Sequence, residues 1–373
     1  MRYLENMKAM NSITNKVLAA QSVGRVMTFP EQITLMPLQA CNYKCVMCNE
    51  WKADEKPEMS RELLDKIRPV LPFVRTLFIT GGEPLMYKRL KELLRIGAEA
   101  GCDLWMVTNG SLLDEKRRDM VLEHGLGRIK ISLDAAKPLT YKAIRGGDFF
   151  RVIGNIAQLY KSKLVNGLRF PEVQLGFVAM RKNIAELPKL VVLASEIGVK
   201  SIYVSYMGVQ NEESIPESLY FHQEMSDDCM LAATEAAKRH GMLLELPPLF
   251  SEKSSPQHIF DRSGQHCLEP WRNLFIRPDG RCNLCCGGGG GCGNLNETSF
   301  EEMWNHPARV KARKRVNTNN PPKPCLSCKT IKQCAQDLGT HFNGKKLRQA
   351  ALQWGEAQGL LPEKSPLEVE QAC

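Results

Sequence analysis

The sequence predicts an α/β fold, an open and partial (β/α)6 barrel of the TIM type, followed by a small cysteine-rich α+β domain. Short apolar runs alternate with longer segments of helical periodicity from about residue 33 to 246. Six such repeats over about 210 residues imply parallel strands joined by right-handed crossovers, whereas a complete eight-unit barrel needs roughly 250 residues. Beyond residue 247 the periodicity weakens, and eight cysteines fall between residues 267 and 334. The run Pro278-Asp279-Gly280 in this segment predicts a hairpin turn.

The strands and helices follow from the residue pattern. Runs rich in β-branched and apolar residues are typical of buried strands, and here they cover 33–38, 74–80, 103–108, 128–134, 173–180 and 201–207. Apolar residues at helical spacing predict helices within 60–71, 87–101, 113–125, 138–163, 183–198 and 221–240, and one further helix within 341–358.

These patterns divide the chain into five parts. A shift to Pro, Ser and charged residues after Leu246 indicates a linker. We therefore expect an N-terminal extension (1–30), the barrel (31–246), a linker (247–262), a cysteine-rich auxiliary domain (263–338) and a C-terminal helix and tail (339–373).

Composition excludes several classes of protein. With 43% hydrophobic and 24% charged residues the chain is an ordinary globular protein, so disordered and fibrous classes are excluded. The net charge of +9 comes from basic residues scattered along the chain, so nucleic acid is not indicated as a partner. No stretch of 18 apolar residues and no secretory signal occur, which favours a cytoplasmic protein without a membrane span.

Fourteen cysteines need an explanation. In a reducing compartment, clustered cysteines bind metal or do redox chemistry more often than they form disulfides. Cys41, Cys45 and Cys48 follow the first predicted strand in the run CNYKCVMC. Three thiolates on one loop can each bind one iron of a 4Fe-4S cluster, which leaves the fourth iron open to a cofactor or substrate. Zinc is the alternative, but it favours four ligands, and no His or fourth Cys is near in sequence.

From these residues the chain resembles the radical S-adenosylmethionine (radical SAM) enzymes. Their hallmark is CxxxCxxC after the first strand of a partial (β/α)6 barrel, and the resemblance runs from Thr34 to Met207. The other motifs also follow strand ends in order: Gly81-Gly82-Glu83-Pro84, Thr108-Asn109-Gly110, Ser132-Leu133-Asp134 and Tyr206-Met207.

The resemblance implies a set of residues that bind S-adenosylmethionine. Gly81, Gly82 and Glu83 would hold the amino group of the methionine part of S-adenosylmethionine. Glycines permit close approach of the backbone to a ligand, and a carboxylate pairs with an ammonium. By the same resemblance, Ser132 contacts the ribose or the carboxylate of S-adenosylmethionine. The backbone at Tyr206-Met207, where the sixth predicted strand ends, would hold the adenine. Arg145, in the run AIRGG, could pair with the carboxylate of the cofactor, because arginine binds carboxylates through two nitrogens. The alternative is that Arg145 is a solvent-exposed residue at the end of a helix. The implied cofactor-binding residues are Gly81, Gly82, Glu83, Asn109, Ser132, Arg145 and Met207.

The C-terminal cysteines resemble the twitch or SPASM extension of this superfamily. The pattern departs from the seven-cysteine SPASM form because Leu338 stands where another cysteine would come. We therefore expect the twitch arrangement, with one auxiliary 4Fe-4S cluster. Its implied ligands are Cys267, Cys285, Cys325 and Cys328, while Cys282, Cys286, Cys292 and Cys334 stay open as replacements or as ligands of a second auxiliary centre.

The resemblance implies an enzyme that cleaves S-adenosylmethionine reductively to a 5'-deoxyadenosyl radical and removes a substrate hydrogen atom. An auxiliary cluster favours net oxidation, so we expect a radical SAM oxidoreductase that dehydrogenates a small molecule and takes electrons from a reductant such as flavodoxin or ferredoxin. A maturase that makes a thioether or carbon-carbon crosslink in a ribosomal peptide is the alternative. A non-catalytic iron-sulfur electron carrier is the third reading, disfavoured because a carrier needs neither an open iron nor the Gly-Gly-Glu motif.

Overall fold

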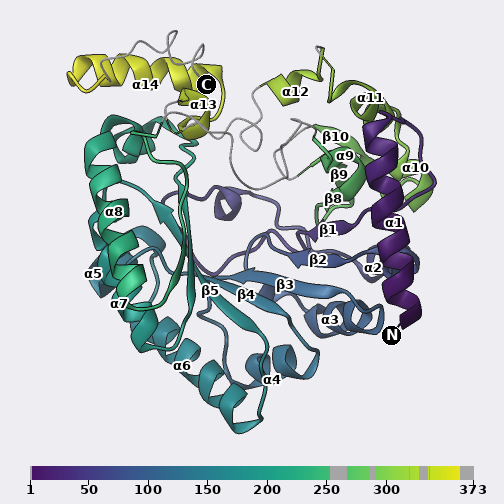
Figure 1. Ribbon diagram of the computed structural model, residues 1–373, viewed down its shortest axis with the longest axis horizontal. Helices are drawn as coiled ribbons and strands as arrows, with labels where there is room; N and C mark the ends of the chain where they lie inside the picture. Colours follow the sequence, from purple (N-terminus) through teal and green to yellow (C-terminus); the bar gives the residue numbers. More distant parts are fainter. Residues whose placement is uncertain are drawn as a thin grey trace.

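The structure is a computed structural model that describes residues 2–252, 267–285, 290–318, 320–326, 335 and 337–361. Its described strands form one sheet of ten in the order β10-β9-β8-β1-β2-β3-β4-β5-β6-β7, curved into an open barrel (Figure 1). The strands β1 to β8 are parallel to one another, whereas β9 is antiparallel to β8 and β10 is antiparallel to β9. The strands are β1 (Gln32–Leu35), β2 (Thr76–Ile79), β3 (Asp103–Thr108), β4 (Arg128–Ser132), β5 (Glu172–Ala179), β6 (Ser201–Tyr206), β7 (Leu243–Glu245), β8 (Asn273–Ile276), β9 (Arg281–Asn283) and β10 (Gly291–Asn294).

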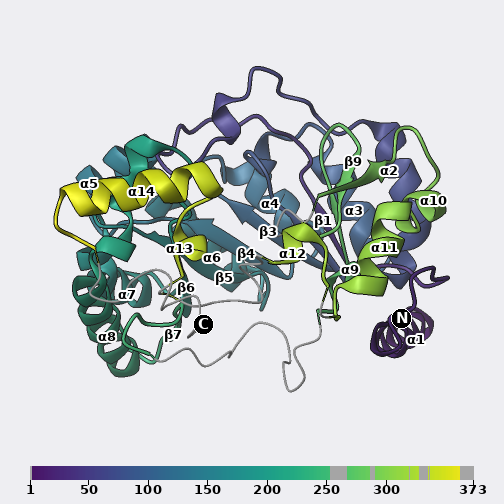
Figure 2. The ribbon, with the colours of Figure 1, turned by 90° about the horizontal axis from the view of Figure 1, so that it is seen from above.

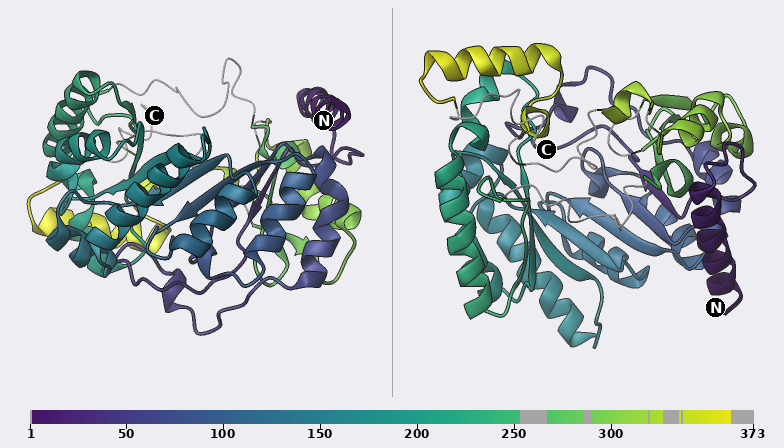
Figure 3. Two further views of the ribbon diagram at one scale, coloured as in Figure 1. Left: turned by 90° about the horizontal axis from the view of Figure 1, so that it is seen from below. Right: turned by 45° about the horizontal axis from the view of Figure 1, so that its top comes forward.

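Helices follow the strands and cover the outer face of the sheet (Figure 3). They are α2 (Arg61–Ile67), α3 (Leu90–Glu99), α4 (Glu115–Glu123), α5 (Pro138–Arg145), α6 (Phe149–Val165), α7 (Leu187–Glu196) and α8 (Gln223–Arg239). Short 3-10 helices are η1 (Glu50–Lys52), η2 (Arg68–Phe73), η3 (Pro84–Met86), η4 (Ile184–Glu186), η5 (Glu212–Glu217) and η6 (Leu219–Phe221).

The partial barrel and its six strands are confirmed. Side chains alternate along each strand, and those on the helix side form the core. Gly97 of α3 shows that Leu77 and Leu104 project from the sheet toward the helices, because a Cβ at this glycine would lie 2.6 Å from the Leu104 side chain and 3.0 Å from the Leu77 side chain. The predicted helix 60–71 is an α-helix only as far as Ile67, because Pro69 and Pro72 interrupt its hydrogen-bond ladder and the chain continues as a 3-10 helix.

The C-terminal segment extends the sheet of the barrel, which the sequence analysis did not predict. β8 pairs with β1 in parallel, with Gln32 opposite Asn273. The hairpin predicted at Pro278-Asp279-Gly280 is present between β8 and β9, and Gly280 takes the positive φ of +81° that the turn requires. Its helices are α9 (Glu269–Arg272), α10 (Phe300–Trp304), α11 (Pro307–Arg315), α12 (Lys323–Leu326), α13 (Leu338–His341) and α14 (Lys345–Ala357).

The predicted C-terminal helix begins later than expected. α14 starts at Lys345 because Gly344, with φ +91°, separates it from α13. Both Figure 1 and Figure 2 show α14 beside the α5 and α8 side of the molecule and α12 on the side of α11. Most of the predicted linker, 253–262, and the tail 362–373 lie outside the described residues.

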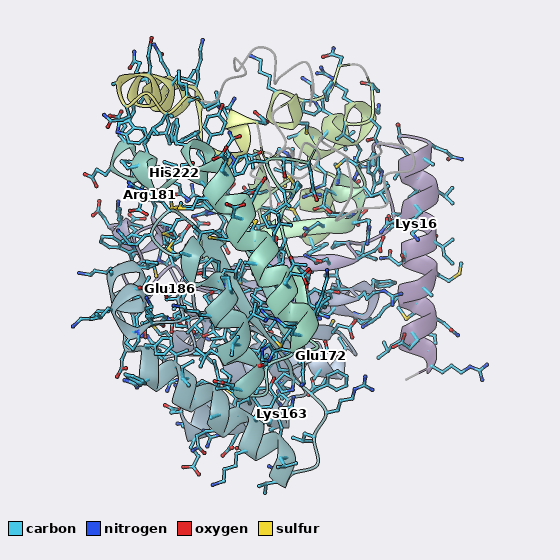
Figure 4. All side chains as sticks on the ribbon, turned by 60° about the vertical axis from the view of Figure 1, so that its left-hand side comes forward. Lys16, Lys163, Glu172, Arg181, Glu186 and His222 are labelled. Atoms are coloured by element: carbon cyan, nitrogen blue, oxygen red, sulfur yellow. The ribbon has the colours of Figure 1, made fainter. Side chains whose placement is uncertain are left out.

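The N-terminal extension holds a long helix, α1 (Arg2–Ala20), that the pattern did not predict. Its buried positions are mainly polar, and Asn11 both donates to the Phe29 carbonyl and accepts from the Phe29 N–H, each at 2.9 Å. Lys16 of α1 lies at the far side of the molecule from His222 (Figure 4). Within the part of the chain described, no helix has the length and apolar character needed to cross a bilayer.

Candidate functional site

The three N-terminal cysteines lie on the loop that follows β1, at the carboxyl ends of the parallel strands. The Cys48 N–H donates to the Cys45 carbonyl at 3.1 Å, so the second and third cysteines share a tight turn. Tyr43, between the first two, is buried against Gly147, where a Cβ would come within 2.2 Å of the tyrosine ring. Gly147, after the end of α5, therefore leaves the space in which Tyr43 of the cysteine loop packs.

The Gly81-Gly82 pair brings the end of β2 against the start of the cysteine loop. A Cβ on Gly82 would lie 2.0 Å from the Ala40 carbonyl oxygen, and Gly81 has φ +120°. The Glu83 N–H then donates to that Ala40 carbonyl at 2.9 Å. In the structure, the close approach that these glycines permit is that of the chain itself, directly before Cys41.

Glu83 is buried and joins the ends of β2 and β3. Its carboxylate accepts hydrogen bonds from the Thr108 hydroxyl at 2.6 Å, the Asn109 N–H at 2.8 Å and the Leu85 N–H at 3.0 Å. Burial raises the pKa of Glu83, and these three donors oppose the shift. A carboxylate held this way is fixed in place and is ready to compensate a nearby cationic group.

Asn109 connects the end of β3 to the cysteine loop. Its amide donates to the Asn42 side chain at 2.9 Å and lies 4.0 Å from the Cys41 sulfur. Asn42 donates in turn to Ser111 at 2.9 Å, and the Ser111 hydroxyl returns to Asn109 at 2.6 Å. This closed ring of three polar side chains orients the loop next to Cys41. The roles of Asn42 and Ser111 were missed, although both residues flank motifs that the sequence analysis used.

Asp134 and Arg145 form a buried ion pair beside Cys45. The Arg145 guanidinium reaches one Asp134 oxygen at 2.5 and 2.6 Å, and its third nitrogen lies 3.7 Å from the Cys45 sulfur. Asp134 also accepts from the Val178 N–H at 2.7 Å and takes a positive φ of +56°. The alternative, that Arg145 is a solvent-exposed residue at a helix end, is wrong. Arg145 is buried together with Asp134 and is only 8% exposed.

The two remaining predicted cofactor residues also stand at strand ends. Ser132 is the last residue of β4 and is partly exposed. Met207 follows β6, is buried, and donates its N–H to the Ala179 carbonyl at 3.0 Å. All seven predicted cofactor-binding residues therefore lie at or just after the carboxyl ends of β2, β3, β4 and β6 or at the end of α5.

The donor set of the cysteine loop fits an iron-sulfur cluster. Burial raises the pKa of Cys45 to about 11, and the charges of Cys48 and Cys41 add to the shift, so the three thiols lie within electrostatic range of one another. In the described ranges, no three Cys, His, Asp or Glu side chains form a site for a single metal ion. The guanidinium near Cys45 and the amide near Cys41 are donors of the kind that stabilise metal-bound thiolates.

The C-terminal cysteines fall into two groups. Cys282 and Cys292 are fully buried on β9 and β10, and Arg309 donates to the Cys292 sulfur at 3.5 Å. Cys285 lies two residues beyond the end of β9. Cys267 and Cys325 are partly exposed, as Cys285 is. Cys328, Cys286 and Cys334 lie outside the described residues.

Comparison with known families agrees with this geometry. A sequence model of the radical SAM superfamily matches residues 35–194, and a model of the SPASM iron-sulfur cluster-binding domain matches residues 267–329. The chain is a radical SAM protein with a SPASM-type C-terminal domain. Its cofactors are S-adenosylmethionine, the 4Fe-4S cluster that binds it, and an auxiliary 4Fe-4S cluster.

Relatives of this radical SAM protein differ in what they do. An AdoMet-dependent heme synthase of Methanosarcina barkeri is 26% identical over 324 residues, which cover 79% of this chain and 87% of that protein. A probable GTP 3',8-cyclase of Saccharolobus solfataricus is 34% identical over 180 residues, 47% of this chain and only 56% of the cyclase.

Solved structures share the fold. Streptococcus suis SuiB bound to S-adenosylmethionine has a TM-score of 0.62 at 16% identity, covering 86% of this chain and 77% of SuiB. Native anSMEcpe with bound AdoMet has a TM-score of 0.60 at 15% identity, covering 88% and 98%. At this identity the likeness concerns the fold alone.

Proposed function

We propose that this radical SAM protein is an oxidoreductase that dehydrogenates a small molecule inside its barrel. When bound, the cluster and S-adenosylmethionine supply a radical that removes a hydrogen atom from an unactivated C–H group. The auxiliary cluster would supply an acceptor for one further electron; together with release of one proton and the hydrogen atom already removed, this amounts to a two-electron oxidation of the substrate. Flavodoxin or ferredoxin would supply the electron for each cleavage, and we propose the cytoplasm as the location.

The observation that carries the proposal is the contrast between the two faces of the sheet. The helix side is apolar, whereas Phe78, Trp105, Lys130 and Tyr203 stand partly exposed on the inner side, below the strand ends that hold the cysteine loop. A cavity of about 140 Å³ lies on that inner side. A cavity of this size supports a small substrate, as does the name of the heme synthase relative.

The chain's own residues would have three tasks. Asn109 and Arg145 would hold the cysteine thiolates through hydrogen bonds. Glu83 would compensate the ammonium of the methionine part, and Ser132 and Met207 would position the ribose and adenine. The barrel wall would exclude water from the reacting groups.

Peptide maturation is the second candidate because of a larger groove. An open cavity of about 780 Å³ lies between the cysteine loop, the segment after β6 and the start of α14, with Lys52, Gln210, Glu212 and Lys345 among its lining residues. An extended peptide could enter there. The 140 Å³ cavity on the inner face, in contrast, does not need a peptide to fill it.

The test is anaerobic incubation of reconstituted protein with S-adenosylmethionine and dithionite. Formation of 5'-deoxyadenosine and methionine is expected; an electron carrier would form neither. Incubation with small-molecule extracts and with synthetic precursor peptides from neighbouring genes then separates the two enzyme classes by which one gains mass-shifted product. A product two hydrogens lighter in the small-molecule arm supports dehydrogenation, and a crosslinked peptide contradicts it.

A further inference from the structure

The inner face of the barrel carries a lysine whose ammonium has no anionic partner among the residues described in the structure. Along β4, Ile129 and Ile131 are buried on the helix side, so Lys130 projects to the inner side. Its ammonium lies 3.8 Å from the centre of the Tyr203 ring. Register places Tyr203 opposite Gly176 and Gly176 opposite Ser132. The side chain therefore leans across β5 toward the level of Ser132, where the cofactor site begins.

The contacts of Lys130 differ from those of its neighbour Arg128. Arg128 stacks on Trp105 at 4.3 Å and pairs with Glu172 at 3.3 Å. Figure 4 shows that Glu172 lies at the end of the barrel opposite Arg181, which follows the carboxyl end of β5. Among the residues that the structure describes, no oxygen accepts a hydrogen bond from Lys130 and no carboxylate lies within ion-pair distance.

The carboxylate whose charge acts on Lys130 is already engaged in a hydrogen bond. Glu245 of β7 accepts a hydrogen bond from Gln174 at 2.7 Å and acts on Lys130 only through longer-range attraction. Burial lowers the pKa of Lys130, and Arg128 adds to this shift while Glu245 opposes it. An ammonium without an acceptor in a partly buried site is unfavourable unless a ligand compensates it.

The space beside the ammonium is suitable for a ligand with an apolar body. The lining of the 140 Å³ cavity consists of Lys130, Gln32, Phe78, Trp105, Met106, Arg128 and Gln174, and Arg128 is already paired with Glu172. Two aromatic rings, a methionine, two glutamines and two cations around a small volume match the usual composition of a small-molecule site, an apolar lining with a few polar groups.

We propose that Lys130 binds an oxyanion of the substrate, a carboxylate or a phosphate, while Phe78 and Trp105 pack against its apolar part. The inference rests on the proposed function, since it names the substrate class of the same barrel. With its oxyanion near the level of Ser132 and its apolar part against Phe78 and Trp105, the ligand would lie along the inner face, below the strand ends that carry the candidate cofactor site.

The test uses three probes of one shape: benzoate, phenyl phosphate and the neutral benzamide. Ligand-detected NMR titrations of the full reconstituted chain give a Kd for each. A charge-assisted hydrogen bond predicts that at least one anion binds about tenfold or more tightly than benzamide. Whichever anion binds more tightly identifies the oxyanion as carboxylate or phosphate.

Variants locate the effect. Lys130→Met should remove the preference for the anion and Lys130→Arg should retain most of it, while Lys161→Met, at an exposed position on α6, is the matched control. Thermal melting of each variant checks folding. Equal binding of all three probes to the wild type, or an undiminished anion preference in folded Lys130→Met, would overturn the proposal.

The two proposals fail separately. Wild-type protein that forms no 5'-deoxyadenosine with dithionite contradicts the proposed function, whereas the probe titrations need neither reductant nor turnover. An anion preference that depends on Lys130 supports the oxyanion site even then.

Discussion

Glu83→Gln tests whether the glutamate of the Gly-Gly-Glu motif is both a structural residue and a cofactor residue. One Glu83 oxygen accepts from Leu85 and Thr108, and the other accepts from Asn109. Glutamine has the same size but only one acceptor oxygen, so its NH2 group must face a backbone N–H. A buried donor left without an acceptor costs about 1–3 kcal/mol, which is the expected loss in the free energy of unfolding.

The structural effect is measured by urea unfolding of the reconstituted protein. Glu99→Gln is the control, because Glu99 is exposed on α3 and its ion pair with Arg95 is worth at most about 1 kcal/mol. The cofactor effect is measured by titrating the cluster spectrum with S-adenosylmethionine. Loss of a charge-assisted hydrogen bond of roughly 1.5–3 kcal/mol should weaken binding about tenfold or more.

The two readouts separate the roles of Glu83. A less stable variant with unchanged affinity would mean that Glu83 only joins the ends of β2 and β3. A variant as stable as the wild type would refute the hydrogen-bond argument, because the unpaired donor next to Asn109 would then have no cost.

Three further predictions concern the cysteine loop. Reconstituted protein should hold about eight irons, and changing Cys41, Cys45 and Cys48 together to Ala should remove about four irons and all cleavage of S-adenosylmethionine; about twelve irons in the wild type would instead reveal a third cluster. Burial raises the pKa of Cys45 from 9.0 to about 11, so the neutral thiol stabilises the iron-free fold below pH 9, and this contribution is lost as the pH rises through 11. Denaturant unfolding at several pH values should show this loss in the free energy of unfolding of the wild type, and Cys45→Ala should not show it. Gly147→Leu should lower iron content by displacing the tyrosine of the loop, whereas Gly154→Ala, with open space around it, should leave iron content unchanged; equal iron content in both would contradict the packing argument.

The parallel strands could be predicted because each carries a buried apolar face. The N-terminal helix could not, since its protein-facing side holds Asn11 and Asn15, while Tyr3 and Met10 are exposed. A pattern search for an apolar stripe cannot tell which side of such a helix is buried. Its position depends on hydrogen bonds to the Phe29 backbone, which only the folded chain supplies.

Strand β8, which lies between β9 and β1, was missed for a different reason. Its residues Asn273–Ile276 are too few to show strand alternation, and the hairpin that follows is antiparallel, as expected for a separate small domain. The parallel pairing with β1 joins segments about 240 residues apart, and no local pattern encodes that contact. The sequence therefore predicted the auxiliary segment's turn but not its continuity with the barrel sheet.

At the site, motif order placed the cofactor residues on the correct strand ends, but it could not assign their partners. Arg145 was expected to meet the carboxylate of S-adenosylmethionine, and the structure places it between Asp134 and Cys45. Cofactor binding by Arg145 stays a prediction, and such binding would have to share the guanidinium with Asp134. The ion pair joins residues 11 positions apart across a turn with a positive φ, which residue spacing does not reveal.

The cysteine loop is positioned by protein contacts from three directions. Glu83 binds the backbone at Ala40 before Cys41, the Asn109 ring holds Asn42, and the Val46 N–H donates to the Ile144 carbonyl at the end of α5. A loop ordered in this way loses little conformational freedom when iron binds, so more of the binding free energy is available to deprotonate the buried thiols. The same contacts bring the loop to the ends of β2, β3 and β4, directly above the inner face that carries Lys130. With the oxyanion bound at Lys130 as proposed, the contacts that position the cysteine loop would also determine which C–H group of the substrate lies within reach of the cofactor.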